Sequence, residues 1–391
     1  MDNYRYIIVG GGMSADAAVD GIREIDQENK ILVISSDSVP PYNRPPLSKG
    51  LWKGKDPSSI WRNTDEKKVD LKLNTLVTKV DPQKKTVETN SGEEIEFGKL
   101  LLATGGTPRK LPFGGESVIY YRNFADYQKL LALSEEKTKF SVIGSGFIGS
   151  EIAAALAMHG REVSLFDIGP GIGWNIFPEH MVKFLNDYYQ EKAVSVFPGA
   201  KIEDIAETSS GYSIRLQNGD SYDTEVVVAG IGIQPNVKLA EQSGLRVTNG
   251  IEVDQFLNTS EKDIFAAGDV ANFYNPLLNK RIRVEHEDNA NAMGKQAGRN
   301  MAGAGESYDY LPFFYSDLFD LGYEAVGELD SRSQIVEDWQ EKYQKGVLYY
   351  LNGGRVTGVL LWNEWDKVDA AREVIGLPGP VEPKTLIERI K

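Results

Sequence analysis

The sequence predicts an α/β protein that contains two Rossmann-like domains and an α+β C-terminal domain. Three observations lead to this fold class. An apolar run, a glycine-rich turn and a helical pattern follow one another near the N-terminus, and the same order recurs after residue 139. From about Tyr310 onward, short strand patterns alternate with turn signals before a final helix. A chain of 391 residues also exceeds one ordinary hydrophobic core, which favours several domains.

The first repeat, YRYIIVGGGMSADAAVDGIREI, opens with an apolar strand over Tyr6–Val9. Gly10, Gly12 and Ala15 follow in GxGxxA spacing, and a second strand is expected at residues 31–35. In this strand–helix–strand context, the glycines let the backbone approach a dinucleotide pyrophosphate at the positive end of a helix. The sequence therefore predicts a dinucleotide site here.

An acid after the second strand usually accepts the adenosine ribose hydroxyls of such a site. Ser36 stands at the strand end, where the acid is common, and Asp37 follows one residue later. We expect both residues to lie beside the ribose.

The second repeat, FSVIGSGFIGSEIAAALAMHGREVSLFD, carries Gly144, Gly146 and Gly149 as a full GxGxxG. Its second strand, at residues 163–166, ends in Asp167, and no Arg or Lys occurs between Asp167 and Trp174. A carboxylate at this position accepts from a ribose 2′-hydroxyl and repels a 2′-phosphate. The sequence therefore predicts NADH rather than NADPH at the second site.

Composition excludes several classes of function. The chain has no cysteine, so disulfide, thiolate-metal and cysteine-nucleophile chemistry are ruled out, and three histidines make a metal site improbable. The net charge of −14 opposes nucleic-acid binding. No signal peptide is recognisable, and no apolar run reaches the roughly 18–20 residues that cross a bilayer, so we expect a cytoplasmic protein without membrane contact.

Two further stretches connect the repeats. LLATGGTPR, at residues 101–109, predicts a buried strand that ends in a glycine-rich turn, and DIFAAGDVA, at residues 263–271, predicts a strand–turn–helix with Asp269 near the helix start. In this order with the two fingerprints, they resemble the two-dinucleotide-binding flavoproteins of the glutathione-reductase-like superfamily. The resemblance implies FAD in the first site and NAD(P)H in the second, with Asp269 bonded to the ribityl or pyrophosphate portion of FAD.

The lack of cysteine separates this chain from the dithiol and single-thiolate members of that superfamily. The remaining chemistry is direct transfer of hydride from NADH to the flavin, followed by electron transfer to an external acceptor.

The segment PYNRPPLSKGLW, at residues 41–52, contains two consecutive prolines, which favour the start of a helix at residues 47–49. The same segment narrows the resemblance. It is similar to the oxygenase-type ferredoxin reductases and to apoptosis-inducing factor. VIGSGFIGSE, GIGIQPNV, AGDVANFY, RVEHEDNA, YSDLFDLGYEAVGELDS and GVLYYLNGGRVTGVLLWN resemble the apoptosis-inducing-factor branch in particular. The resemblance spans nearly the whole chain. The targeting segment and the long C-terminal insertion of the mitochondrial protein are not matched, so its apoptotic roles are not carried over.

The resemblance implies an FAD-binding domain formed by residues 1–115 and 238–309, an NAD-binding domain over residues 116–237 and a C-terminal domain over residues 310–391. The residues expected at FAD are Gly10, Gly12, Ser14, Ala15, Ser36, Asp37, Arg44, Lys49, Val77, Thr104, Gly105, Arg122, Asp269, Glu285, His286 and Tyr315. Those expected at NAD are Gly144, Gly146, Phe147, Ile148, Gly149, Asp167, Gly232 and Glu324. Trp61 lies in a loop shorter than the family's, and its match to a nicotinamide-side Trp stays open.

Two residues are expected to take part in the chemistry. Lys49 would reach toward flavin N5, and because a buried ammonium needs a partner, the resemblance assigns Glu151 to it. A helix that starts near Glu285 would stabilise negative charge on the reduced flavin. His159 and His180 have no partner pattern, so we expect surface or packing roles for them.

Three functions stay open at this point. The first is an NADH-oxidising flavoenzyme whose acceptor is a small redox protein, a quinone or a dye. The second is a rubredoxin or ferredoxin reductase, and the third is a redox sensor that forms a long-lived charge-transfer complex with NADH. A homodimer is expected from the family resemblance.

Overall fold

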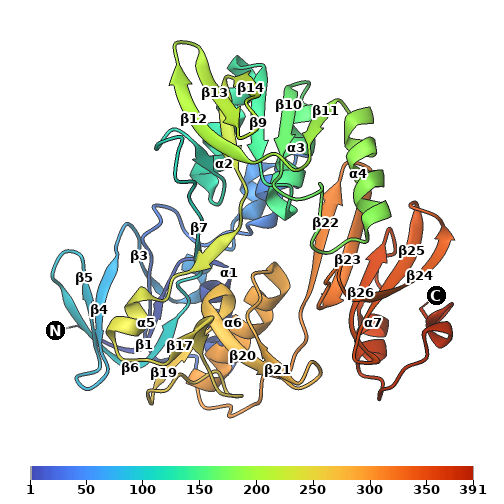
Figure 1. Ribbon diagram of the computed structural model, residues 1–391. Helices are drawn as coiled ribbons and strands as arrows, with labels where there is room; N and C mark the ends of the chain where they lie inside the picture. The colour runs from blue at the N-terminus through green and yellow to red at the C-terminus, as the bar shows by residue number, and fades with distance from the viewer. Residues whose placement is uncertain (1, 391) are drawn as a thin grey trace. The chain divides into compact units, whose positions relative to one another are not determined.

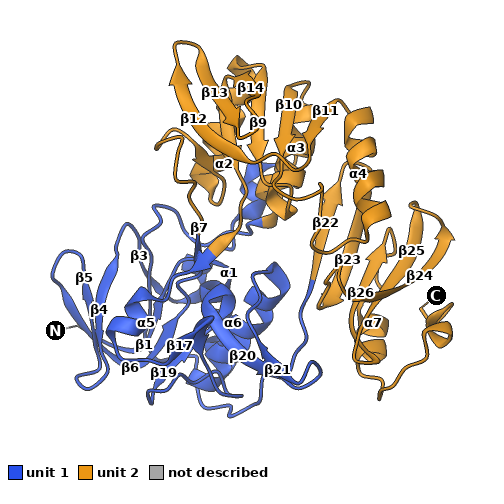
Figure 2. Cartoon of the chain, viewed as in Figure 1, with its two compact units in different colours: residues 1–44, 56–107, 234–313 blue, residues 45–55, 108–233, 314–391 orange. Residues whose placement is uncertain are grey.

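The computed structural model describes residues 2–390, and these residues fall into two compact units (Figures 1 and 2). Unit 1 comprises residues 1–44, 56–107 and 234–313, and unit 2 comprises residues 45–55, 108–233 and 314–391. The predicted second Rossmann-like stretch and the C-terminal stretch belong to the same unit. The division into three domains stays a prediction.

Unit 1 is built on a seven-stranded sheet with the order β3-β2-β1-β6-β5-β4, in which β19 also pairs with β6. The pairs β1–β2, β1–β6, β2–β3 and β6–β19 are parallel, and β4–β5 and β5–β6 are antiparallel. The strands are β1 (Asp2–Val9), β2 (Ile31–Ile34), β3 (Asp70–Lys72), β4 (Val77–Asp81), β5 (Thr86–Thr89), β6 (Glu94–Leu102) and β19 (Ile264–Ala266).

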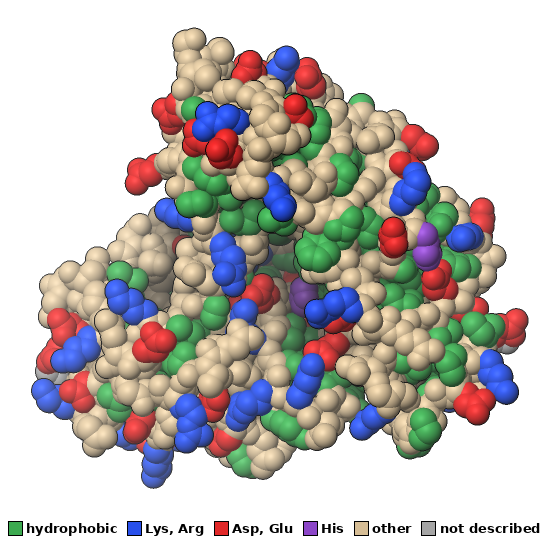
Figure 3. All heavy atoms as spheres, viewed as in Figure 1, with side chains coloured by type: hydrophobic (Ala, Val, Ile, Leu, Met, Phe, Trp, Pro, Cys, Tyr) green, Lys and Arg blue, Asp and Glu red, His purple; other side chains and the backbone are tan. Residues whose placement is uncertain are grey.

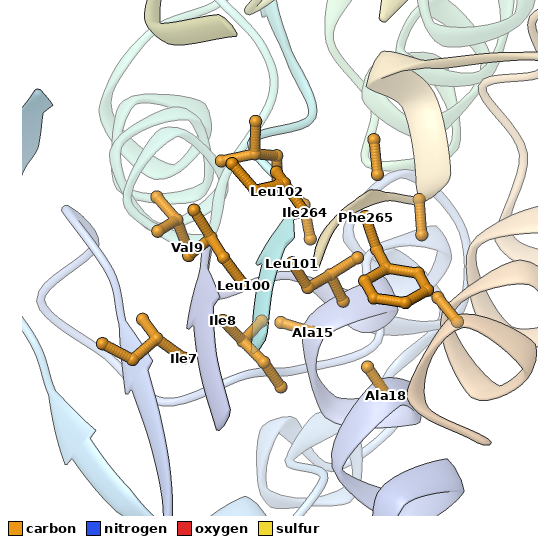
Figure 4. Packing of buried hydrophobic residues seen from close by; sticks show 14 of the residues in the cluster. Ile7, Ile8, Val9, Ala15, Ala18, Leu100, Leu101, Leu102, Ile264 and Phe265 are labelled. Carbon is orange, nitrogen blue, oxygen red and sulfur yellow. The ribbon is translucent and has the colours of Figure 1, made fainter. Parts of the chain in front are cut away.

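The core of unit 1 lies between the central strands and the helices. Ile8 and Leu101, from neighbouring strands, are fully buried with Ala15 of α1 (Met13–Arg23), as the close-up in Figure 4 shows. Since parallel strands flanked by helices are covered on both faces, their sequences are continuous apolar runs.

Helices α1 and α6 (Glu287–Met301) approach each other closely because glycines line their contact. A Cβ at Gly21 would lie 2.0 Å from the Lys295 carbonyl oxygen, and one at Gly298 would lie 2.1 Å from that of Ala18. The remaining elements of unit 1 are α5 (Lys238–Gln242), β17 (Val247–Thr248), β18 (Gly250–Glu252), β20 (Ala271–Asn275), β21 (Lys280–Ile282), and the 3-10 turns η3 (Pro57–Ile60), η4 (Thr64–Lys67) and η5 (Gly268–Val270).

Unit 2 contains a second parallel sheet, with the order β11-β10-β9-β15-β8. The strands of this sheet and the helices between them are β8 (Ile119–Tyr120), α2 (Phe124–Glu136), β9 (Lys139–Ile143), α3 (Phe147–Met158), β10 (Glu162–Phe166), α4 (Glu179–Glu191), β11 (Val194–Phe197) and β15 (Val226–Ala229). A three-stranded antiparallel sheet formed by β12 (Ile202–Thr208), β13 (Gly211–Leu216) and β14 (Ser221–Thr224) comes after β11 in the chain.

The C-terminal part of unit 2 is a five-stranded sheet with the order β22-β23-β26-β25-β24. Its elements are β22 (Phe313–Leu318), β23 (Leu321–Gly327), β24 (Gln334–Glu341), β25 (Lys345–Asn352), β26 (Arg355–Trp362), α7 (Val368–Ile375) and the 3-10 turn η6 (Pro383–Leu386). Strands β7 (Gly106–Pro108) and β16 (Ile233–Pro235) form a two-stranded sheet where the chain passes from one unit to the other.

Two local expectations are corrected by the structure. The segment after the prolines forms two 3-10 turns, η1 (Pro45–Ser48) and η2 (Gly50–Lys53), rather than an α-helix. The DIFAAGDVA stretch is also not strand–turn–helix, because η5 leads directly into strand β20. The local pattern was misleading since pairing with a neighbouring strand, here β21, decides the conformation of the residues after the turn.

Candidate functional site

The first glycine cradle, in unit 1, leaves space where a pyrophosphate would lie. Gly10 has φ 128°, and a Cβ there would lie 2.1 Å from the Ala103 carbonyl oxygen, so only glycine fits. At Gly12, by contrast, an added Cβ would have one atom within 4 Å among residues 2–390, apart from the chain neighbours of this glycine, and that atom is Arg44 Nη2, at 3.9 Å. Gly12 caps α1 without a side-chain hydrogen bond, so the first backbone N–H groups of the helix are available to an anion. Ala15, the third residue of the GxGxxA motif, is fully buried where the helix packs on the sheet.

Two charged side chains lie beside this cradle. Arg44 Nη2 is 3.9 Å from Asp37 Oδ2, and both side chains are partly exposed. Ser36 is exposed, whereas the buried Ser35 accepts a hydrogen bond from the Asp37 backbone N–H at 3.0 Å. The structure therefore brings Gly12, Asp37 and Arg44 together at the carboxyl edge of the first sheet.

The other expected FAD residues of unit 1 fall into several environments. Ser14 is 8% exposed and packs against Gly268 and Gly294. Thr104 donates its hydroxyl to the Asn236 carbonyl at 2.9 Å, next to Gly105. Val77 belongs to the hydrophobic core, so any contact with a cofactor falls to its main chain.

Asp269 and Glu285 both bond to an arginine, Arg283, that sequence reasoning missed. Arg283 Nη1 donates to the Asp269 carbonyl oxygen at 2.9 Å and to Glu285 Oε1 at 2.6 Å. His286 is the N-cap residue of α6, so the helix expected to start near Glu285 is confirmed. Trp61, whose role stayed open, forms an edge-to-face contact with Tyr42 at 5.8 Å.

The second glycine cradle, in unit 2, has the same arrangement of close and open glycine positions as the first. Gly144 has φ 92° and lies close to the Gly230 carbonyl, and a Cβ at Gly149 would lie 1.8 Å from the Gly144 carbonyl oxygen. Apart from the two chain neighbours of Gly146, no atom of the described residues 2–390 lies within 4 Å of a Cβ added there. Gly146 and Ile148 are exposed at the start of α3, and Phe147 is half-buried. The middle glycine of each cradle thus faces open space, which fits a bound dinucleotide.

Asp167 has more partners than a ribose-binding role alone would require. Its Oδ2 accepts from both the backbone N–H and the hydroxyl of Ser145, each at 2.6 Å, and its Oδ1 accepts from the Gly169 N–H at 2.7 Å. Ser145 is 1% exposed. Asp167 therefore joins the glycine loop to the loop after β10, and Ser145, the variable residue of the fingerprint, carries that link.

Lys49 and Glu151 form a buried ion pair inside unit 2. Lys49 Nζ lies 2.7 Å from Glu151 Oε2, and the two side chains are 13% and 2% exposed. Ser48 donates to the same oxygen and Ser316 donates to Oε1, each at 2.6 Å. The Lys49 ammonium also lies 5.1 Å from the centre of the Tyr315 ring. Glu151 thus accepts three hydrogen bonds from residues far apart in the sequence.

Two buried tyrosines complete the surroundings of this pair. Burial, and then the charge of Glu151, raise the pKa of Tyr189 and of Tyr323 well above the ordinary value. Tyr189 donates its hydroxyl to the Ser150 carbonyl at 3.1 Å. Both phenols stay neutral beside the carboxylate.

The segment that carries Lys49 is anchored by Trp52 and Tyr121, which the sequence did not single out, and by His159, for which a surface or packing role was expected. Trp52 Nε1 donates to the Leu47 carbonyl at 2.8 Å, and Tyr121 donates its hydroxyl to the same oxygen. His159 Nε2 lies 2.7 Å from the Trp52 carbonyl oxygen, and because a carbonyl only accepts, this nitrogen carries the proton. This hydrogen bond joins the C-terminal end of α3 to the turn after Lys49.

Two expected residues of unit 2, Arg122 and Gly232, are held by backbone hydrogen bonds, and a third, Glu324, has one buried carboxylate oxygen open to a ligand. The backbone N–H of Arg122 donates to Asp126, within the capping box of α2. Gly232 has φ 88°, and its carbonyl accepts from the backbone of Arg109. Burial raises the pKa of Glu324. Among residues 2–390, Glu324 Oε2 is buried and has no hydrogen-bond partner, so this oxygen fits a donor from a ligand.

Charged side chains of both signs are interspersed over the face seen in Figure 3. The residues that the structure describes contain no cluster of His, Asp and Glu that could hold a metal ion. No helix within residues 2–390 is long and apolar enough to cross a bilayer.

Comparison with known proteins identifies the family. The family model described as "Pyridine nucleotide-disulphide oxidoreductase" matches residues 4–294, and "Apoptosis-inducing factor, mitochondrion-associated, C-term" matches residues 333–376. Apoptosis-inducing factor 1, mitochondrial, of Dictyostelium discoideum is 33% identical over 96% of this chain and 79% of that protein. The anthranilate 1,2-dioxygenase system ferredoxin–NAD(+) reductase component of Burkholderia cepacia is 30% identical over 98% of this chain and 97% of that protein.

Among solved structures, a chain of the covalent putidaredoxin reductase–putidaredoxin complex superposes with a TM-score of 0.90 at 27% identity, covering 98% of this chain and 95% of that chain. The class defined by the fold and the cradles is the FAD-dependent NADH oxidoreductases with two dinucleotide-binding folds. The chain belongs to the pyridine nucleotide-disulphide oxidoreductase family, in the branch of apoptosis-inducing-factor-like proteins and oxygenase-type ferredoxin reductases. The expected fold class, family branch and cofactors, FAD and NADH, are thereby confirmed. Because the chain lacks cysteine, electrons pass to an external acceptor without a thiol relay.

Proposed function

We propose that this protein is an NADH-oxidising reductase of a small external redox protein, in which Lys49 and Glu151 serve the flavin. The single observation that carries the proposal is the buried Lys49–Glu151 pair, at 2.7 Å, in a chain without cysteine. When bound, FAD supplies the step between the two-electron donor NADH and a one-electron acceptor. The chain's own residues supply binding, orientation and a fixed positive charge.

Each part of the chain has a separate task in this proposal. The open space at Gly12 and the Arg44 side chain hold the FAD pyrophosphate, and the space at Gly146 holds that of NADH. Lys49 would present its ammonium to the flavin ring near N5. Ser48 and Ser316 hold the Glu151 carboxylate in one orientation, which in turn fixes the direction of the Lys49 side chain.

The acceptor class is supported by what the relatives are named for. The solved neighbour is a reductase held in a complex with putidaredoxin, and the Burkholderia relative is a ferredoxin–NAD(+) reductase component. The alternatives that the same experiments address are a quinone or dye as acceptor and a redox-sensing role with slow turnover, and they also address a homodimeric state. A cytoplasmic location stays a separate prediction.

The test is steady-state turnover of the FAD-loaded protein with NADH against NADPH, across a rubredoxin, a [2Fe–2S] ferredoxin, a quinone and ferricyanide. We expect NADH to be preferred and an iron–sulfur protein to be reduced in catalytic turnover, with a rate that depends on salt. Turnover with quinone alone would refute the acceptor class. A persistent long-wavelength absorbance band after NADH addition, without turnover on any acceptor, would support the sensor instead. Light scattering with and without NADH would report the oligomeric state.

A further inference from the structure

Four cations from three separate segments of the chain line one cavity of unit 1. The cavity has a volume of about 600 Å³. The cations are Arg5 of β1, Lys30 before β2, and Lys84 and Lys85 in the turn of the β4–β5 hairpin. The lining also holds the acid Glu96, which accepts a hydrogen bond from Asn3 Nδ2 at 3.5 Å. We call this site the basic cavity.

The basic cavity lies at the edge of the first sheet that is opposite the first glycine cradle. Strands β1 and β2 pair in parallel over residues 6–9 and 31–34. Arg5 and Lys30 directly precede the paired part, whereas Gly10 directly follows it. Because the two strands are parallel, their amino ends share one edge of the sheet and their carboxyl ends share the other. A ligand in the basic cavity would therefore leave the FAD cradle free.

The Arg5 side chain lies against β6 at a position that has no side chain of its own. A Cβ added at Gly98 would lie 3.1 Å from Arg5 Cδ and 3.2 Å from Arg5 Nη1. The guanidinium carbon of Arg5 is also 5.8 Å from the centre of the Tyr6 ring. These contacts hold the Arg5 side chain at the cavity while the residue stays exposed to solvent.

Main-chain hydrogen bonds hold the lysines of the cavity in place. The Lys30 carbonyl accepts from the Tyr6 N–H at 3.2 Å, and the Lys85 carbonyl accepts from the Phe97 N–H at 2.9 Å. The Lys85 ammonium donates to Asp263 Oδ2 at 2.6 Å. The backbone thus fixes where each side chain begins, while the exposed Lys30 ammonium is able to turn toward a ligand.

Three of these cations, Arg5, Lys30 and Lys84, form no ion pair within residues 3–390. The fourth, Lys85, shares Asp263 with a further lysine outside the lining. The chain has 57 acidic and 43 basic residues, so a shortage of carboxylates does not explain the unpaired cations. Like charges around one cavity repel one another, so the cluster lowers stability until an anion neutralises it.

We propose that the basic cavity binds an oligophosphate, an anion with several closely spaced negative charges. The Arg5 guanidinium offers paired N–H donors to one phosphate, and the ammonium groups of Lys30 and Lys84 neutralise the others. A volume of about 600 Å³ is within the range of small-molecule sites. An inorganic oligophosphate and the phosphate chain of a nucleotide share this chemistry. The site is independent of the electron acceptor that the flavin serves.

The test is isothermal titration calorimetry of inorganic tripolyphosphate into protein saturated with FAD and NAD⁺, so that both glycine cradles are filled, at constant ionic strength. In Arg5→Gln/Lys30→Gln the dissociation constant should rise about tenfold or more, because charge-assisted hydrogen bonds to phosphate are lost. Lys79→Gln is the matched control, since Lys79 is an exposed lysine of β4 in the same hairpin and outside the cavity lining. Its dissociation constant should stay within about twofold of the wild type.

Thermal unfolding supplies a second readout. Without tripolyphosphate, Arg5→Gln/Lys30→Gln should unfold at or above the wild-type temperature, because repulsion within the cluster is relieved. With tripolyphosphate, the wild type and Lys79→Gln should gain stability, whereas Arg5→Gln/Lys30→Gln should not.

Four results would overturn the proposal. These are an absence of tripolyphosphate binding, an unchanged affinity in Arg5→Gln/Lys30→Gln, an equal loss in Lys79→Gln, and binding of sulfate or citrate as tight as that of tripolyphosphate. ATP separates the two sources of the ligand. Equal affinity for ATP and tripolyphosphate would support a site for the phosphate chain alone, and tighter binding of ATP that still depends on Arg5 and Lys30 would support a nucleotide.

Discussion

Breaking the Lys49–Glu151 pair from one side is expected to destabilise unit 2 more than removing both charges. At 2.7 Å and an effective dielectric constant of about 20, the two charges attract each other by about 6 kcal/mol, and desolvation offsets much of this gain. Removing one partner of a buried pair typically costs about 3–5 kcal/mol, because the other charge stays buried. In Lys49→Met, Glu151 keeps its two serine donors, so we expect the lower end, about 3 kcal/mol.

In the double variant Lys49→Met/Glu151→Gln no buried charge is left without a counter-charge. A glutamine of similar size accepts from one serine hydroxyl and donates to the other, since a hydroxyl can do either. We therefore expect the double variant to be at least as stable as Lys49→Met alone. The coupling free energy from the double-mutant cycle should then be about 2 kcal/mol or more.

The assay is urea unfolding followed by tryptophan fluorescence, with all variants at the same saturating FAD concentration because a bound ligand adds to stability. The exposed pair Lys53–Asp317, at 3.3 Å, supplies the control cycle, because Lys53 lies on the same segment as Lys49 and Asp317 follows Ser316 on β22. Its coupling should be below about 1 kcal/mol. Additive losses of stability in the Lys49–Glu151 cycle, or a coupling free energy no larger than that of the control pair, would show that Lys49 and Glu151 are not coupled as a buried ion pair.

Three further predictions test other parts of the account. Burial raises the pKa of Asp263, but hydrogen bonds from two lysines outweigh this effect and hold the pKa at about 2. Asp263→Asn should therefore lower the free energy of unfolding at pH 7 by about 2 kcal/mol. Since this pKa lies below the ordinary 3.8, the loss should be full above about pH 4 and vanish as the pH falls through about 2, in urea unfolding against pH. Gly146→Ala should fold normally and raise the KM for NADH, whereas Gly149→Ala should unfold at lower urea, as its Cβ meets a carbonyl oxygen at 1.8 Å. Glu324→Ala should weaken NAD⁺ binding roughly tenfold by calorimetry, because it removes a carboxylate oxygen that would accept a hydrogen bond from the ligand. An unchanged affinity would show that Glu324 is not part of the site.

Local sequence patterns were sufficient to predict the parts of the site that depend on consecutive residues. Both glycine cradles form where the GxGxx(G/A) spacing follows a strand. Close backbone contacts fix Gly10, Gly144 and Gly149, and Ala15, at the third position of the first cradle, is fully buried. The pairing of Lys49 with Glu151 was expected from family resemblance, because no spacing rule joins residues so distant in the chain.

The remaining contacts depend on tertiary register, which one sequence does not reveal. Ser316 reaches Glu151 because β22 passes α3 at that residue, and nothing in YSDL distinguishes its serine from a surface one. In the sequence, nothing distinguishes Ser145 and Asn186 from polar surface residues. Only the folded structure shows that both form hydrogen bonds with the loop after β10. His159 likewise gains its partner only through the turn at Trp52.

Anaerobic stopped-flow spectroscopy of the FAD-loaded protein tests directly whether Lys49 serves flavin reduction by NADH. Lys49→Ala should bind FAD as the wild type does and reduce it at saturating NADH at least tenfold more slowly, as expected for loss of an electrostatic contact of about 1.4 kcal/mol in the reaction. The control Lys53→Ala, a 45% exposed lysine of the same segment, should keep the wild-type rate. A wild-type rate of flavin reduction in Lys49→Ala would contradict the account.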